Sequence, residues 1–190
     1  PEIKVTVLSN DPEATEKCFD VEAVNRWQLF QVWNAIRKSN LLISGGGSLL
    51  QDVTGPKNVF YYLGVVKIAQ LLRKPIMCYA QGIGPLQLPL NRRLSSKVLN
   101  RVQYITVRDE RSAEVISELG VTKPPVNVTA DPAFGLEKEK LDLPDGRQLL
   151  KEAGADVFKQ SIGFALREWK GLEKYKDAAA KTADLLMEKG

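Results

Sequence analysis

The order of apolar and polar residues along the chain predicts strands that alternate with helices. Residues 3–8 alternate β-branched and polar side chains as a strand does, whereas residues 28–39 carry apolar side chains at helical spacing. Residues 76–80 are continuously apolar, which is typical of a strand that is buried on both faces in a parallel sheet. The pattern recurs along the chain and predicts an α/β fold, a doubly wound parallel sheet of the Rossmann-like type. Further strands are expected at 21–24, 40–43, 104–107, 126–129 and 161–166, and further helices at 59–73, 91–101, 148–153 and 172–189, with one more ending at Leu119.

Three consecutive glycines follow the third predicted strand, in the sequence LLISGGGSLLQD. A glycine inside a regular element costs about 0.5–1 kcal/mol relative to alanine, so the run predicts a sharp turn that lets another group approach the backbone. Where such a turn leaves a strand and opens toward a helix, its amides can bind an anion. The spacing is not the G-x-G-x-x-G of a dinucleotide site. We therefore interpret Gly45, Gly46, Gly47 and Ser48 as one wall of an interdomain ligand cleft; a tight connection without a ligand is the alternative.

Polar residues also follow the other predicted strands directly. Gln81 and Gly82 begin a second glycine-rich loop, and Arg108, Asp131 and Arg167 each follow an apolar run. Because ligands bind beyond the carboxyl ends of parallel strands, we expect these residues to face a ligand. Arg108 can bind a carboxylate or phosphate through two hydrogen bonds. Asp131 can serve as a general base or accept a hydrogen bond from a sugar hydroxyl, although a turn-stabilising role is also open.

The composition changes after residue 135 and indicates a domain boundary. Residues 136–160 are charged and rich in turn residues, so we interpret them as a linker region between a Rossmann-like N-terminal domain at 1–135 and the incomplete start of a second one at 161–190. Arg167 would then face the first domain across a cleft. The chain begins with proline and ends after one helix, so we expect it to be truncated at both ends.

Composition and charge narrow the chemistry further. The chain has 190 residues, no histidine and a net charge of +4, and its basic residues form no cluster interleaved with aromatics, which favours a small anionic substrate over nucleic acid. Cys18 and Cys78 have neither metal-ligand nor disulfide spacing, and the acidic residues are scattered, so no metal is expected. Free cysteines fit a reducing compartment, and no apolar run approaches the roughly 20 residues of a membrane span. We expect a cytoplasmic protein.

Five segments, in this order, resemble the polysaccharide pyruvyl transferase family and most of all the bacterial cell-wall enzymes: LLISGGGSLLQD, YAQGIGPL, ITVRDERSAEVISELGV, VTADPAF and IGFALREW. The resemblance implies the N-terminal half of a two-domain, glycosyltransferase-B-like architecture. It also implies transfer of an enolpyruvyl unit from phosphoenolpyruvate, without a cofactor, to a sugar such as N-acetylmannosamine of a cell-wall polysaccharide or its lipid-linked precursor. A pyruvate ketal forms and phosphate leaves. A lipid-linked acceptor would imply peripheral association with the membrane.

Several parts of the family's pattern have no counterpart in this sequence. These are its first strand with a Gly/Asn/Asp-rich loop, a histidine-bearing segment and further basic residues of the C-terminal domain, so we expect these 190 residues alone to be inactive. Two other functions stay open. One is a nucleotide-sugar glycosyltransferase of the same architecture; the other is a non-catalytic carbohydrate-binding module, against which the strand-end arginines argue because a neutral glycan does not need them.

Overall fold

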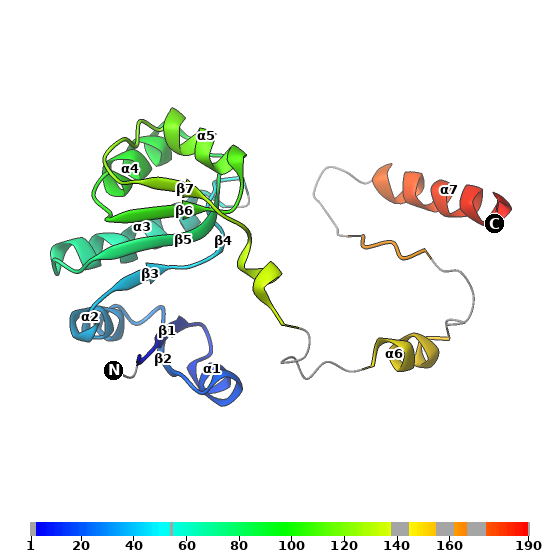
Figure 1. The fold of residues 1–190 in the computed structure, drawn as a ribbon, viewed down its shortest axis with the longest axis horizontal. Coiled ribbons are helices and arrows are strands. Elements are labelled where there is room, and N and C mark those ends of the chain that lie inside the picture. Colours follow the sequence, from blue (N-terminus) through cyan, green and yellow to red (C-terminus); the bar gives the residue numbers. More distant parts are fainter. Residues whose placement is uncertain (1–2, 54, 138–144, 155–161, 167–173, 190) are drawn as a thin grey trace. The chain divides into compact units, whose positions relative to one another are not determined.

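A computed structural model describes residues 3–53, 55–137, 145–154, 162–166 and 174–189 of the chain. The chain divides into two compact units, Pro1–Leu136 and Glu137–Gly190. All strands of the described residues belong to the first unit, which also holds the helices α1 to α5 (Figure 1). The candidate functional site is therefore built on the first unit.

The first unit contains one large and one small sheet, and every strand pair in both is parallel. The large sheet has the order β3-β5-β6-β7, and β4 also pairs with β5. The small sheet pairs β1 with β2. The strands are β1 (Thr6–Ser9), β2 (Glu22–Asn25), β3 (Leu42–Ser44), β4 (Gly47–Leu50), β5 (Ile76–Ile83), β6 (Tyr104–Val107) and β7 (Val126–Val128).

Helices connect these strands in the predicted alternation. Local sequence explains where several of them begin: the Asp11 carboxylate accepts a hydrogen bond from the Ala14 amide, and the Asp109 carboxylate accepts one from the Ser112 amide. The helices are α1 (Pro12–Phe19), α2 (Leu29–Lys38), α3 (Pro56–Leu71), α4 (Pro89–Leu99) and α5 (Glu110–Glu118), followed by the 3-10 helix η1 (Pro132–Gly135). The predicted α/β class with a parallel, Rossmann-like doubly wound arrangement is confirmed.

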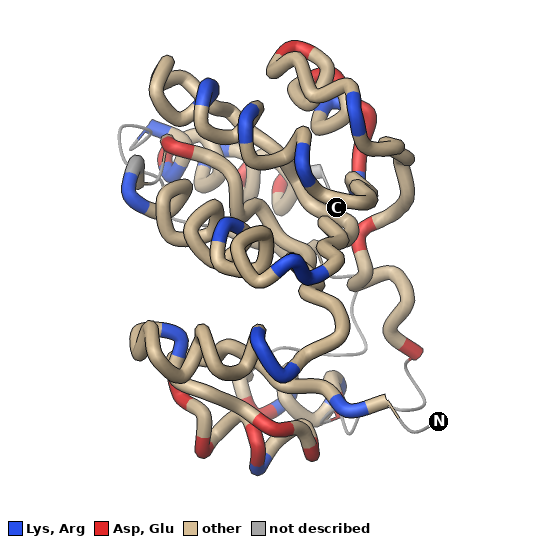
Figure 2. The backbone as a smooth tube through the Cα atoms, turned by 90° about the vertical axis from the view of Figure 1, so that its left-hand side faces the viewer, with Lys and Arg blue, Asp and Glu red and all other residues tan. Residues whose placement is uncertain are grey.

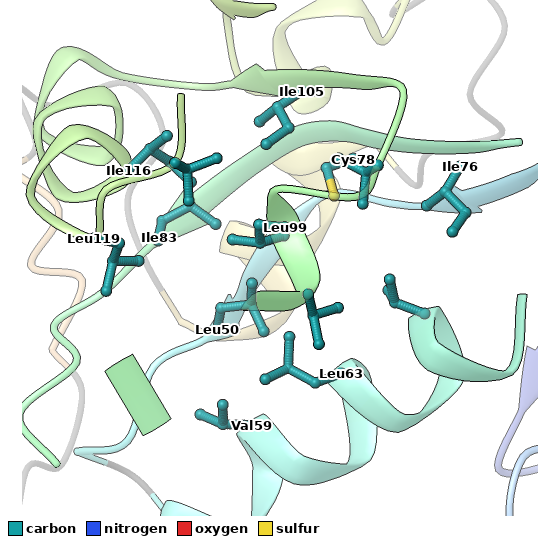
Figure 3. Close-up of a cluster of buried hydrophobic side chains, with 14 of the residues drawn as sticks. Leu50, Val59, Leu63, Ile76, Cys78, Ile83, Leu99, Ile105, Ile116 and Leu119 are labelled. Carbon is teal, nitrogen blue, oxygen red and sulfur yellow. The ribbon is translucent and has the colours of Figure 1, made fainter. Parts of the chain in front are cut away.

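The hydrophobic core lies between the large sheet and the helices that connect its strands (Figure 3). The central strand β5 supplies Ile76 and Cys78, and β6 supplies Ile105, as expected of strands whose sequences are continuously apolar. Leu63 of α3 and Leu99 of α4 pack into the same cluster. Burial in this apolar setting raises the pKa of the Cys78 thiol to about 12, so Cys78 is a packing residue rather than a nucleophile.

The segment after the glycines differs from the prediction. The sharp turn predicted at the glycines does not take the chain out of the sheet, because Gly47–Leu50 forms the short strand β4, in which Gly47 pairs with Gln81 and Leu50 with Ile83. Leu50 is buried in the core, and its carbonyl accepts a hydrogen bond from the Gly84 amide, which keeps the segment on the sheet. β5 accordingly runs three residues beyond its predicted end.

The second unit holds two described helices, α6 (Gly146–Glu152) and α7 (Lys174–Lys189), close to the predicted ranges. The prediction of a strand at 161–166 is wrong for the part that is described, since residues 162–166 form no regular element. A strand needs a neighbour for its backbone hydrogen bonds, and the described residues of this unit contain no other strand. The proposed linker and second domain stay predictions.

Candidate functional site

Three of the predicted site residues meet at the edge of the large sheet where β6 and β7 end. Arg108 directly follows β6 and Asp131 follows β7, and Nη1 of Arg108 donates a hydrogen bond of 2.8 Å to Oδ2 of Asp131. Nη2 of Arg108 donates a second hydrogen bond, of 2.9 Å, to Oγ of Ser48 in β4. We call Arg108, Asp131 and Ser48 the strand-end cluster. Ser48 and Asp131 lie 60 and 23 positions from Arg108 in the sequence, and the Arg108 guanidinium joins them.

A second carboxylate also faces Arg108. Oδ2 of Asp109 lies 3.5 Å from Nε of Arg108, while Oδ1 of Asp109 accepts the Ser112 amide at the start of α5. Hydrogen bonds from the side chain and backbone of Ser112, and then the charge of Arg108, lower the pKa of Asp109. Two carboxylates therefore offset the charge of Arg108. Each terminal guanidinium nitrogen still has a second N–H, because each makes one described hydrogen bond.

Asp131 is held as an ionised acceptor. Its Oδ1 accepts the Ala133 amide at 3.1 Å, at the first turn of η1, and its Oδ2 accepts Arg108. These two hydrogen bonds, the Ala133 one first, lower the pKa of Asp131. The side chain remains 34% exposed. A carboxylate with a lowered pKa is suited to accept and orient a hydroxyl more than to donate a proton.

Gly82 is the residue that makes room for Arg108. A Cβ atom built at residue 82 would lie 2.8 Å from Nε and from Nη2 of Arg108, closer than real Cβ atoms approach other heavy atoms. Gly82 is buried in β5, next to β6, so any larger residue would compete with the guanidinium for the same space. Gly82 therefore contacts the strand-end cluster, and its predicted ligand contact stays a prediction.

Gln81 holds the glycine segment. Its side chain is only 1% exposed, and its Nε2 donates to the backbone oxygen of Ser44 at 2.9 Å and to Oγ of Ser44 at 2.7 Å. These bonds join the end of β5 to the residue that precedes Gly45. These bonds occupy the Gln81 side chain within the protein, and its predicted ligand contact stays a prediction.

The glycine segment lies against the turn that carries Asp131. A Cβ atom at Gly46 would lie 3.5 Å from Cγ of Pro132, whereas Gly45 has open space around its Cβ position. Gly47 has φ +89°, a left-handed conformation that favours glycine. The segment thus reaches the same corner of the sheet as Arg108 and Asp131, and ligand binding by Gly45–Ser48 stays a prediction.

The structure adds residues that sequence reasoning missed. Oγ1 of Thr106 accepts the Ala80 amide at 2.7 Å, and Oγ of Ser112 accepts the Ile83 amide at 2.9 Å, so two buried hydroxyls hold the irregular end of β5. The sequence signal for Thr106 is a hydroxyl inside the apolar run YITV, which indicates a buried polar group that needs a hydrogen-bond partner. Asp52 is also structural: its carboxylate accepts the amides of Gln87 and Leu88 ahead of α4.

Comparison with known proteins decides the family. Residues 1–190 match the sequence profile of the family described as polysaccharide pyruvyl transferase. The chain belongs to the polysaccharide pyruvyl transferase family. It is also 26% identical, over 170 residues, to the amylovoran biosynthesis protein AmsJ of Erwinia amylovora, a match that covers 85% of this chain and 40% of that relative. No solved structure matches it significantly.

Arg167 of this pyruvyl transferase family member lies outside the described residues, so its predicted place across a cleft stays a prediction. Within the described ranges no group of three or more His, Cys, Asp or Glu residues could hold a metal ion. In the same ranges, no helix has both the length and the apolar character needed to cross a membrane.

A hollow of about 560 Å³ lies away from the strand-end cluster, beside the start of β5. It is lined by the basic residues Lys67, Arg73, Lys74 and Arg101, among others. Arg73, Lys74 and Arg101 follow the ends of α3 and α4, where they complement the negative ends of the helix dipoles, and Lys67 lies in α3 ahead of its last turn. Figure 2 shows that Lys and Arg are distributed over several helices. We assign the hollow no role in the reaction.

Proposed function

We propose that this chain supplies one wall of an active site that transfers a pyruvyl unit from phosphoenolpyruvate to a sugar, N-acetylmannosamine in a cell-wall polysaccharide or its lipid-linked precursor. Family membership supports pyruvyl transfer to a polysaccharide. The observation that carries the residue assignment is the guanidinium of Arg108, held between Asp131 and Ser48 at the carboxyl ends of parallel strands. This is where α/β folds bind their ligands.

Each residue of the strand-end cluster has a role in this proposal. The remaining N–H groups of Arg108 donate to the carboxylate or phosphate of phosphoenolpyruvate, and the backbone amides of Gly45–Ser48 add donors beside them. Asp131 accepts a hydrogen bond from the attacking sugar hydroxyl and receives its proton as the new bond forms. Arg108 and Asp131 are thus the proposed catalytic residues, while Gly82 makes room for Arg108 and Gln81 holds the glycine segment.

The proposed reaction begins at the methylene carbon of phosphoenolpyruvate. Protonation of the methylene carbon of phosphoenolpyruvate places positive charge on C2; a sugar oxygen attacks C2 and releases its proton to Asp131. The bond between C2 and the phosphate oxygen then breaks, and phosphate leaves with the bonding electrons. A second sugar hydroxyl adds to C2 and gives its proton to the departing phosphate, which closes the ketal and leaves hydrogen phosphate as the second product. We assign no residue to the initial proton donation.

The charge balance around Arg108 indicates that this wall is only part of the site. Asp109 and Asp131 together offset the single charge of Arg108, and phosphoenolpyruvate carries both a carboxylate and a phosphate. Further cations are therefore needed, and we propose Arg167 and residues of a longer protein. The chain spans about 40% of the length of the curated relative that it matches. We accordingly expect the 190 residues alone to lack activity.

We propose that phosphoenolpyruvate is the donor substrate, that no cofactor or metal takes part, and that the protein is cytoplasmic. A lipid-linked acceptor would bring it to the membrane surface without insertion. Nucleic acid is not a partner.

Ligand-dependent thermal stability separates this proposal from a nucleotide-sugar glycosyltransferase and from a carbohydrate-binding module. A ligand that binds only the folded protein raises its Tm. We expect phosphoenolpyruvate, but not UDP-sugars, to raise the Tm of the full-length protein, and Arg108→Gln to remove the effect. Arg111→Gln is the matched control, because Arg111 is exposed and pairs with Glu114 away from the cluster. Stabilisation by UDP-sugars alone would overturn the proposal.

A further inference from the structure

A second site candidate surrounds Arg26, which directly follows β2. Its guanidinium carbon lies 4.3 Å from the ring centroid of Tyr61, 5.0 Å from that of Trp27 and 5.5 Å from that of Tyr62. The rings of Trp27 and Tyr61 are themselves 5.1 Å apart and tilted by 50°. We call Arg26, Trp27, Tyr61 and Tyr62 the Arg26 cluster. Cation–π contacts of this kind fix both the arginine and the rings.

Trp27 is exposed and yet held in place. Its side chain is 65% exposed, but its indole Nε1 donates a hydrogen bond of 2.9 Å to Oδ1 of Asn10. Its backbone amide donates to Oδ1 of Asn25, also at 2.9 Å. An aromatic ring fixed at both ends offers a flat apolar surface to a ligand at little cost in side-chain entropy. The apolar C–H face of a pyranose ring has the matching shape.

The charge of Arg26 is not offset as that of Arg108 is. Among the described residues no Asp or Glu lies within ion-pair distance of its guanidinium, whose described polar partner is the Tyr62 hydroxyl at 3.4 Å. Its Nε is buried without a hydrogen-bond partner in the same part of the chain. A partly buried arginine in this state favours a ligand that brings a planar carboxylate, which a guanidinium binds bidentately.

The position of the cluster fits a ligand site as well. Arg26 and Asn10 follow the carboxyl ends of β2 and β1, and the Arg26 amide donates to the backbone oxygen of Ser9 at the end of β1. Tyr61 and Tyr62 belong to the second turn of α3, the helix that follows the glycine segment and β4. The Arg26 cluster therefore joins the carboxyl edge of the small sheet to α3, the helix that follows β4.

From this geometry we propose that the Arg26 cluster is an acceptor subsite for an acidic saccharide unit, a pyranose that carries a carboxylate. The sugar ring stacks on Trp27, and its carboxylate accepts hydrogen bonds from Arg26. The subsite rests on the proposed function in one respect, that the acceptor is a saccharide. It recognises a unit of the acceptor away from the pyruvylated sugar and takes no part in the chemistry.

Binding of defined oligosaccharides to the 190-residue chain tests the subsite. Tetragalacturonate is the acidic probe, and maltotetraose is a neutral probe of equal length. The indole N–H signals of Trp27, Trp33 and Trp169 are followed by ¹⁵N NMR and assigned by substitution. We expect tetragalacturonate to shift the Trp27 signal and to bind at least about tenfold more tightly than maltotetraose, the lower bound for a hydrogen bond to a charged group.

Substitutions then assign the contacts. Arg26→Gln should reduce tetragalacturonate binding to the level of maltotetraose, Arg26→Lys should give an intermediate affinity, and Trp27→Ala should abolish binding of both. The matched controls are on α2: Phe30→Ala removes another exposed aromatic, and Arg37→Gln removes another exposed charge. Both should bind tetragalacturonate like the unchanged chain.

Three results would overturn the subsite. The first is a Trp27 signal that neither probe shifts, and the second is an Arg26→Gln variant, folded by its NMR spectrum, that binds tetragalacturonate unchanged. The third is equal binding of the two probes, which would exclude the proposed carboxylate. None of these results bears on phosphoenolpyruvate, which is absent from the assay. Conversely, an Arg108→Gln variant that loses stabilisation by phosphoenolpyruvate should still bind tetragalacturonate.

Discussion

The backbone at Gly82 and the guanidinium of Arg108 lie so close that no side chain fits between them. A Cβ atom at residue 82 would stand 2.8 Å from two guanidinium nitrogens and 2.9 Å from Cζ. The residue type at position 82 therefore controls where Arg108 can lie. Arg108 in turn reaches both Asp131 and Ser48.

We predict that Gly82→Ala moves Arg108 without unfolding the protein. The group that must give way is the flexible end of a side chain, so the free energy of unfolding should change by no more than about 1 kcal/mol. In the full-length enzyme, kcat/KM should fall by roughly 100-fold, because misplacing a positioned group costs about that much. Thermal denaturation and phosphate release from phosphoenolpyruvate measure the two quantities.

Gly64→Ala is the matched control for this substitution. Gly64 lies exposed in the middle of α3, and a Cβ atom there meets no atom within 4 Å. It should raise the free energy of unfolding by about 0.5–1 kcal/mol, the helical preference for alanine, and leave activity unchanged. Full activity of Gly82→Ala would show that the position of Arg108 does not matter.

Thr106→Val should destabilise the fold by about 1–3 kcal/mol, because the buried Ala80 amide loses the hydroxyl that accepts its hydrogen bond. Thr129→Val is the control: its hydroxyl donates to the Val107 carbonyl, which still accepts the Thr129 amide after the change. Urea denaturation of both variants measures the difference. Equal losses would mean that the Thr106 hydroxyl has no special role at the end of β5.

Asp52 should make the fold sensitive to acid. Burial alone would raise the pKa of its carboxyl, but the amides of Gln87 and Leu88 and the side chain of Asn91 outweigh burial and lower it. A lowered folded pKa means that Asp52 stabilises the fold above its unfolded pKa, about 3.9, and that this contribution disappears as the pH falls through the folded value.

Asp52→Asn should therefore be less stable than the unchanged protein at pH 7, by about 1–3 kcal/mol for the lost charge-assisted bonds. The difference should shrink as the pH falls below about 4, where the carboxyl takes up its proton in the unfolded chain, and the charge contribution should be lost once the pH has fallen through the lower folded pKa. Urea denaturation at a series of pH values gives the two curves. A gap that stays constant down to pH 2 would assign the stabilisation to packing instead of charge.

The fold class and the meeting of strand ends could be predicted because both follow from local pattern. Continuous apolar runs such as residues 76–80 require a sheet covered by helices, and polar residues after adjacent strands must share an edge. The pattern therefore predicts that Arg108 and Asp131 lie at the same edge of the sheet, and the structure joins them by a hydrogen bond. The sequence predicts a sharper turn at the glycines than the structure has, because a run of glycines gives no sign that Gly47 pairs with β5.

Roles that depend on distant contacts could not be predicted. Asp52 meets Gln87, 35 residues away, and only the folded chain shows that this carboxylate is buried instead of facing a ligand. Gln81 follows an apolar strand like Arg108, yet its side chain points into the protein and bonds Ser44. The strand expected at 161–166 depended on a neighbour that the described residues of its unit do not supply.

Phosphate release by the full-length enzyme, with phosphoenolpyruvate and a lipid- or aryl-linked N-acetylmannosamine acceptor, tests the central claim most directly. Arg108→Gln and Asp131→Asn should each lower kcat/KM by at least about 100-fold, as expected for residues that act on the reacting groups, while Arg111→Gln stays near wild type. Wild-type rates for both Arg108→Gln and Asp131→Asn, in folded protein, would contradict the assignment of the strand-end cluster to the active site.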